Sequence, residues 1–178
     1  MVREMYHTQE KRDVRLQKPV LCIEEDAWLG KGYYFWVDIF DAKRWGTKFK
    51  TKTGSYEIYK CNIDCEDVLD TVFNETHYFW WLEQIEMAAK EIKKKGSKGR
   101  RPTLKQINDY FKKSSEWSAI TGILFQDVPE SYDYSIIEPI KMKNGKTRIF
   151  TYKKRIQLAL YNIEKLENFK LDSTNNCK

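Results

Sequence analysis

Two glycines stand directly before four consecutive aromatic residues in the stretch WLGKGYYFWVDIFDAKRWG, residues 28–46. The aromatic run Tyr33–Trp36 is typical of a β-strand, because aromatic side chains pack well on a pleated surface. A strand of this kind gives no reason for Gly30 and Gly32, which indicate a turn or a close approach of the backbone to another group. The fold must therefore accommodate a turn or a close backbone contact just before this strand.

The composition suits one globular domain, because 178 residues with 41% hydrophobic content can bury a sizeable core. The mean hydropathy is −0.71, and the charged N-terminal stretch 1–13 lacks the apolar region of a secretory signal. We therefore expect a cytoplasmic protein that does not enter a membrane. The four cysteines form no CxxC pair and the two histidines, His7 and His77, are far apart, so we expect reduced thiols and no metal.

The charges are segregated along the chain, which carries a formal net charge of +6. Residues 61–89 contain acidic side chains but no lysine or arginine, whereas residues 90–113 are strongly basic. The basic stretch Lys93–Arg101 suits a phosphate backbone, an acidic partner protein or plain solvent, and its sequence does not choose among them.

Periodicity and turn residues predict an α+β domain over residues 1–172, followed by a flexible tail at 173–178. Either Asp38 or Asp41 is expected to cap the first helix. The stretches 65–72 and 155–169 fit either a strand or a helix. The other expected elements are extended segments at 3–8, 18–24, 33–37, 54–64 and 119–128, helices at 41–49, 77–95 and 103–117, and a hairpin at 134–153 around the turn KNGK.

Three motifs carry a resemblance to a known family. The segment GKGYYF at 30–35 resembles the GKGxYF element of the poly(ADP-ribose)-polymerase-like ADP-ribosyltransferases. The segment DAKRWG at 41–46 is similar to the pairing of small and aromatic residues that follows this element in small bacterial members. Upstream, MYHT at 5–8 stands where the family places a strand that bears a histidine. The order of these motifs resembles the family over most of the chain.

The resemblance implies a split antiparallel β-sandwich with flanking helices and NAD as the substrate. His7 matches the histidine that hydrogen-bonds the nicotinamide ribose, and Tyr34 matches the tyrosine that stacks on nicotinamide. Thr147 stands at the third catalytic position, where the family often has a glutamate. Glu138, on the opposite arm of the predicted hairpin, is the nearest acidic replacement, although a surface glutamate is the alternative interpretation.

The resemblance also implies a binding pocket around these residues. Backbone groups at Thr8 and Gly32 would hold the nicotinamide carboxamide, while Tyr33 and Trp45 would form the wall of the pocket or pack beneath it. An aromatic wall and firm contacts to ribose are what this chemistry needs, because breaking the nicotinamide–ribose bond builds positive charge on the sugar.

The function implied is that of an NAD-dependent mono-ADP-ribosyltransferase, a bacterial toxin or phage-defence effector that modifies a protein or a nucleic acid and that an antitoxin or immunity protein could restrain. The absence of glutamate at Thr147 argues against chain building. Two alternatives stay open, an NAD glycohydrolase and an inactive member that only binds. His7, Tyr34 and the glycines also have structural interpretations, as a satisfied buried histidine, a core tyrosine and a bulge.

Overall fold

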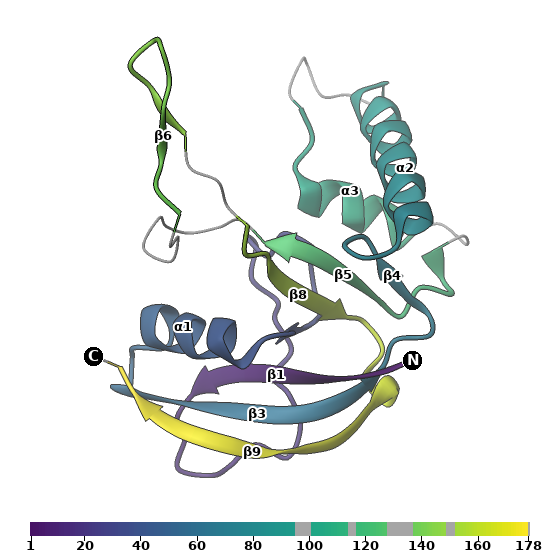
Figure 1. Cartoon of the computed structure of the whole chain (residues 1–178). Helices are drawn as coiled ribbons and strands as arrows, with labels where there is room; N and C mark the ends of the chain where they lie inside the picture. The colour runs from purple at the N-terminus through teal and green to yellow at the C-terminus, as the bar shows by residue number, and fades with distance from the viewer. Residues whose placement is uncertain (95–100, 114–116, 128–136, 149–151, 178) are drawn as a thin grey trace.

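The computed structural model describes residues 1–94, 101–113, 117–127, 137–148 and 152–177. Within these residues the fold is mixed α+β, with a mainly antiparallel sheet and three helices, which confirms the predicted α+β class (Figure 1). In chain order the elements are β1 (Val2–Glu10), β2 (Tyr33–Trp36), α1 (Ile39–Phe49), β3 (Ser55–Asp64), β4 (Val68–Asp70), α2 (Glu75–Lys94), α3 (Leu104–Phe111), β5 (Gly122–Asp127), β6 (Ile140–Lys141), β7 (Thr147–Arg148), β8 (Arg155–Leu160), the 3₁₀ turn η2 (Ile163–Lys165) and β9 (Leu166–Asn176).

The main sheet has the strand order β4-β5-β8-β2-β1-β3-β9, and only the β4–β5 pair is parallel. Strand β1 pairs with β3 along its whole length, from Val2 opposite Asp64 to Glu10 opposite Tyr56. The neighbouring β1–β2 contact, in contrast, has a single aligned pair of residues. This weak seam divides the sheet into a first half-sheet of β1, β3 and β9 and a second half-sheet of β2, β8, β5 and β4.

The helices cover the two half-sheets separately. Helix α1 lies over the first half-sheet, while α2 and α3 lie over the second (Figure 1). On the face away from the helices, one shared apolar core joins the two half-sheets. The first half-sheet contributes residues such as Met5 and Ile63, and the second contributes residues such as Phe35 and Leu158. The seam is thus bridged by apolar packing more than by backbone hydrogen bonds.

Local sequence signals explain most of the boundaries. Asp38, one of the two predicted caps, accepts a hydrogen bond from the Phe40 N–H and so begins α1. Thr103 and Gln106 form a reciprocal capping box at the start of α3. The predicted hairpin is present as β6 and β7, with Gly145 in the left-handed region at its turn.

Several expectations need correction. Residues 173–176, predicted as part of a flexible tail, pair with β3 as the end of β9, because Ser55 to Ile58 offer them a free strand edge. Segment 18–24 forms only one isolated bridge, between Cys22 and Gly32. The ambiguous 155–169 stretch is two strands joined by a 3₁₀ turn.

Three further elements differ in extent or position. Residues 68–70 form a separate strand, β4, which pairs with β5 instead of continuing β3. Helix α3 ends at Phe111, within the range predicted to be helical, 103–117. Of the basic stretch Lys93–Arg101, residues 95–100 lie outside the described residues. In the part of the chain that the structure describes, no helix is long and apolar enough to cross a membrane.

Candidate functional site around His7 and Tyr34

His7 lies in the middle of β1 with only 4% of its side chain exposed, and both of its ring nitrogens are hydrogen-bonded to backbone. The Val20 N–H donates to Nε2 over 3.2 Å. Since Nε2 accepts this bond, the proton of the neutral ring sits on Nδ1, which donates to the Tyr34 carbonyl oxygen over 2.9 Å. The contacts therefore fix the tautomer and the orientation of the imidazole.

Burial also fixes the charge of His7. Removal from water lowers its pKa to about 4, and the nearby cations Lys50 and Arg12 act in the same direction. The bond to the Tyr34 carbonyl acts in the opposite direction but is the weaker influence. His7 is therefore neutral near pH 7 and serves there as a hydrogen-bonding group without a positive charge.

Tyr34 meets His7 through its backbone, while its ring points elsewhere. The Tyr34 hydroxyl donates to the Gly30 carbonyl oxygen over 2.8 Å, and the ring packs into the core beneath α2 and α3. Burial raises the pKa of this hydroxyl, which stays protonated. The imidazole of His7 contacts instead the rings of Phe35 and Phe169. The structure thus brings together the His7 ring and the Tyr34 carbonyl, but not the two rings.

The two glycines that precede β2 have separate structural reasons. Gly30 adopts a φ of +71°, which a residue with a side chain rarely takes. Gly32 approaches β8 closely, since a Cβ there would lie 3.2 Å from the Leu160 carbonyl oxygen. Both backbone groups of Gly32 are also used, because its N–H donates to Cys22 and its carbonyl accepts from Cys22. The glycines therefore permit a turn and a close strand contact.

The other predicted pocket residues surround this point on different faces. Thr8 is buried, and its hydroxyl donates to the Ala42 carbonyl oxygen of α1 over 3.0 Å. Tyr33 is half-buried against the shared core. Trp45 lies on α1, where its ring contacts Trp36. Thr8 and Trp45 thus belong to the α1 side of the sheet, opposite the His7 ring.

Thr147 is not part of this arrangement. It pairs with Lys141 in the exposed β6–β7 hairpin, which projects away from the main sheet (Figure 1). Glu138 is exposed and precedes the same hairpin. The late strand that actually pairs with β2 is β8, in which Gln157 lies opposite Trp36.

Gln157 was not singled out by the sequence, although the apolar run that surrounds it in RIQLAL was a usable signal for a buried strand. Its side chain is 8% exposed. Because directly opposed residues of an antiparallel pair project to the same face, Gln157 shares a face with Trp36. Gln157 therefore lies on the α1 side of the sheet, opposite the His7 ring.

A buried charge cluster adjoins Gln157. The Arg155 guanidinium lies 3.3 Å from Asp127 and 3.8 Å from Asp41, and it stands over the Trp36 ring. Burial raises the pKa of Asp41, and the Arg155 charge counteracts this rise. The cluster thus ties α1 to the second half-sheet by charge.

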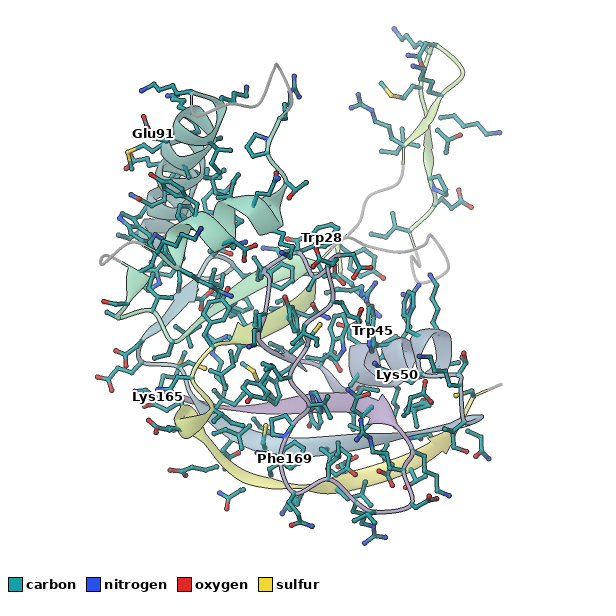
Figure 2. All side chains as sticks on the ribbon, turned by 180° about the vertical axis from the view of Figure 1, so that it is seen from behind. Trp28, Trp45, Lys50, Glu91, Lys165 and Phe169 are labelled. Carbon is teal, nitrogen blue, oxygen red and sulfur yellow. The ribbon has the colours of Figure 1, made fainter. Side chains whose placement is uncertain are left out.

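Residues 11–32, the covering segment, close the His7 side of the site. Apart from the Cys22–Gly32 bridge the segment has no regular structure, and most of its side chains are exposed. It is attached mainly through its backbone, since the Leu16 N–H donates to the Tyr59 hydroxyl and the Val20 N–H donates to His7. Phe169 of β9 lies beneath it (Figure 2). The part before residue 27 can leave without dismantling the core, whereas Leu29 is fully buried in the core beneath α2 and α3.

Among the described residues, no cluster of three or more His, Cys, Asp or Glu side chains has the geometry to hold a metal ion. All four cysteines are free thiols. Comparison of the chain with models of known protein families, with curated proteins and with solved structures finds no match. The candidate site therefore has to be interpreted from its own residues.

Proposed function

We propose that this chain is an NAD-dependent mono-ADP-ribosyltransferase of the ADP-ribosyltransferase-like fold, with an NAD site that the covering segment closes. One observation carries the proposal. Residues 20–22 occupy two of the groups assigned to NAD, the Nε2 atom of His7 and the backbone of Gly32. The segment thus makes the hydrogen bonds to His7 and Gly32 that a bound NAD molecule would make, and it occupies the position proposed for NAD.

The arrangement of the strands supports the same proposal. The histidine strand β1 and the tyrosine strand β2 lie side by side at the seam of a divided sheet, and a helix capped by Asp38 follows β2 directly. This order agrees with the split sandwich that the motifs imply. When the covering segment is in place, His7 and Gly32 have no capacity left for NAD, so binding requires the release of residues 20–22.

The chemistry proposed is transfer of ADP-ribose. The bond between nicotinamide and ribose C1 breaks, nicotinamide leaves with the bonding electrons, and an acceptor nucleophile forms the new bond to C1 and loses its proton. His7, neutral near pH 7, would hold the ribose without repelling the positive charge that develops on the sugar. The third catalytic position implied by the resemblance, Thr147, carries no carboxylate, which favours a single transfer over chain extension.

A second candidate is a binding module without catalysis. Two observations favour it. His7 is buried with both ring nitrogens satisfied, and Thr147, at the position where the family often has a glutamate, lies on the exposed β6–β7 hairpin. In that case the histidine serves the fold alone. The two candidates differ in whether NAD binds once residues 20–22 have been released.

The test is calorimetric titration of the purified full chain with NAD. Val20→Pro removes the N–H that caps His7 Nε2, and Leu16→Pro, as the matched control, removes only the N–H that donates to Tyr59. We expect Val20→Pro to tighten NAD binding about tenfold or more, the effect of removing a competing hydrogen bond of roughly 1.4 kcal/mol. Leu16→Pro should leave the affinity within about twofold, and adding His7→Gln to Val20→Pro should abolish the gain.

Adenine-labelled NAD and cell lysate then separate the activities. Label that enters protein or RNA and is lost in the His7→Gln variant supports transfer, while nicotinamide release without labelling indicates hydrolysis. If folded Val20→Pro protein, verified by its thermal unfolding, binds no NAD, the transferase proposal is wrong and the binding module is the better description.

A further inference from the structure

The outer surface of α1 combines cations with exposed aromatic rings. Its two acidic residues, Asp38 and Asp41, both lie at its N-terminal end, and Asp41 is buried beside Arg155. The cations of the helix and its C-cap are Lys43, Arg44, Lys48 and Lys50, of which Lys43 and Lys48 are exposed. From Lys43 onward the helix therefore carries cations and no acidic residue.

An aromatic row runs along the same helix. The Trp45 ring lies 5.7 Å from that of Trp36 and 4.2 Å from that of Phe49, measured between ring centroids. The row leads from the core to solvent, since Trp36 is buried and Phe49 is 44% exposed. The ammonium of Lys48 stands over the Phe49 ring at 5.1 Å. Figure 2 shows Trp45 and Lys50 on this helix.

The exposed rings are not needed to attach α1 to the sheet. The helix packs on β1, β2 and β3 through small residues, and Gly46 lies so close to the Tyr56 ring that even a methyl group would not fit between them. Ala42 is fully buried on the same side. The face toward the sheet is therefore small and tightly packed, whereas Phe40 and Phe49 remain at the surface.

We propose that the outer surface of α1 binds single-stranded nucleic acid, with the cations on phosphates and the exposed rings stacked on bases. Stacking of this kind requires bases that are not already paired inside a duplex. An anionic membrane fits less well, because the apolar face of α1 is occupied by the sheet and the helix has no second apolar face to insert. The proposal does not depend on NAD and can be tested separately from the transferase activity.

Helix α2 provides a matched comparison. It also carries lysines, but Lys94 pairs with Glu91 and Lys90 lies 4.0 Å from Glu86, so that its positive charges are offset along the helix. Exchanging Lys90 and Lys93 for glutamate changes the net charge of the protein by the same amount as exchanging Lys43 and Lys48. Because the two double variants have the same net charge, any difference in their affinity for nucleic acid depends on where the substitutions lie and not on overall charge.

The experiment is fluorescence anisotropy with a labelled single-stranded RNA or DNA of about 20 nucleotides, long enough to span one such surface, and with the corresponding duplex. We expect Lys43→Glu/Lys48→Glu to weaken single-strand binding about tenfold or more and to flatten the salt dependence of the affinity. Lys90→Glu/Lys93→Glu should change it by less than about twofold. Phe49→Ala should weaken binding about fivefold without altering the salt dependence, while Phe49→Tyr retains it.

Four outcomes would overturn the inference. They are equal losses in the two double variants, duplex binding as tight as single-strand binding, no binding at low salt, and binding only to vesicles of anionic phospholipid. Thermal unfolding of each variant excludes loss of the fold as the cause. If the chain binds nucleic acid as expected but binds no NAD, only the transferase proposal fails.

Discussion

The two half-sheets solve the same packing problem with different residues. In the second half-sheet, β8 is buried at every one of its six positions, between the shared core and the helices α2 and α3. In the first half-sheet, β9 alternates between exposed and half-buried residues and forms the edge. The second half-sheet is thus stabilised mainly by apolar burial, whereas the first depends more on the long strand register between β1, β3 and β9.

The halves are joined by few backbone contacts, so side chains at the two ends of the seam matter. At one end Arg3 of β1 pairs with Asp70 of β4 over 2.9 Å. At the other end Arg155 of β8 pairs with Asp41 of α1. The seam, where the candidate site lies, is therefore stabilised by a few ion pairs and by the shared core.

The largest expected effect tests the contrast between the half-sheets. Leu158→Ala, at a fully buried position of β8, should lower the free energy of unfolding by about 4 kcal/mol. Leu171→Ala, at a half-buried position of β9, should cost about 1 kcal/mol because less apolar area is lost. Urea unfolding measures both. Equal losses would mean that the edge strand contributes as much burial as the central one.

The next effect concerns the ion pairs at the α1 end of the seam. Arg155→Met should destabilise the protein by about 3 kcal/mol at pH 7, because Asp41 and Asp127 stay buried without their cation. Burial already raises the pKa of Asp41, and removing Arg155 raises it further. At pH 5 a larger fraction of this buried carboxyl group is protonated and uncharged. The loss in the free energy of unfolding should therefore be smaller at pH 5 than at pH 7. A loss that does not depend on pH would show that packing, not charge, is what Arg155 supplies.

The third effect is the pH dependence that His7 imposes. Its pKa is about 4 in the folded chain and near 6.5 when unfolded, so only the unfolded state takes up a proton between these values. Stability is therefore full above pH 6.5 and falls as the pH drops, by about 2 kcal/mol between pH 7 and pH 5. His7→Gln should remove this slope in urea unfolding measured across that range, and an unchanged slope would assign it to other groups.

The smallest effect is at the other end of the seam. Arg3→Met should cost about 1 kcal/mol, because the Arg3–Asp70 pair is partly buried and also places the guanidinium over the Phe73 ring. Lys60→Met, which removes an ion pair with Glu4 at a more exposed position, should cost less than about 0.5 kcal/mol. Thermal unfolding can compare the two. A larger loss from Lys60→Met would place the critical ion pair within the first half-sheet and not across the seam.

Local sequence was sufficient for most elements of the fold. The predicted strand at 33–37, the cap at Asp38 and the turn at 143–146 all appear within a residue or two, because each depends on neighbours along the chain. The choice of α+β class followed from these elements. His7 and Tyr34, which the sequence predicts as the NAD-binding pair, lie on the neighbouring strands β1 and β2.

Other features could not be predicted from local signals, because they arise from contacts between distant residues. The periodicity of residues 155–169 fits a strand or a helix equally well. Only the pairing with β2 and β5 decides that β8 is a strand and that Gln157 lies opposite Trp36. Thr147 was placed by a gap-free alignment, which has no information about the hairpin that carries it out of the sheet. Residues 173–176 looked like a tail because the edge of β3 that they pair with is over a hundred positions away.

The sequence by itself determined the alternation of strands and helices, the glycine-framed aromatic strand and the separation of acidic from basic stretches. The tertiary structure alone decided that the Val20 N–H reaches His7, that the Tyr34 ring points away from it, and that α1 exposes Lys43 and Lys48. The physical reason is the range of the interactions. Capping and turn formation act within a few residues, whereas burial and the final hydrogen-bond partners of a buried polar group are set only when distant segments pack together.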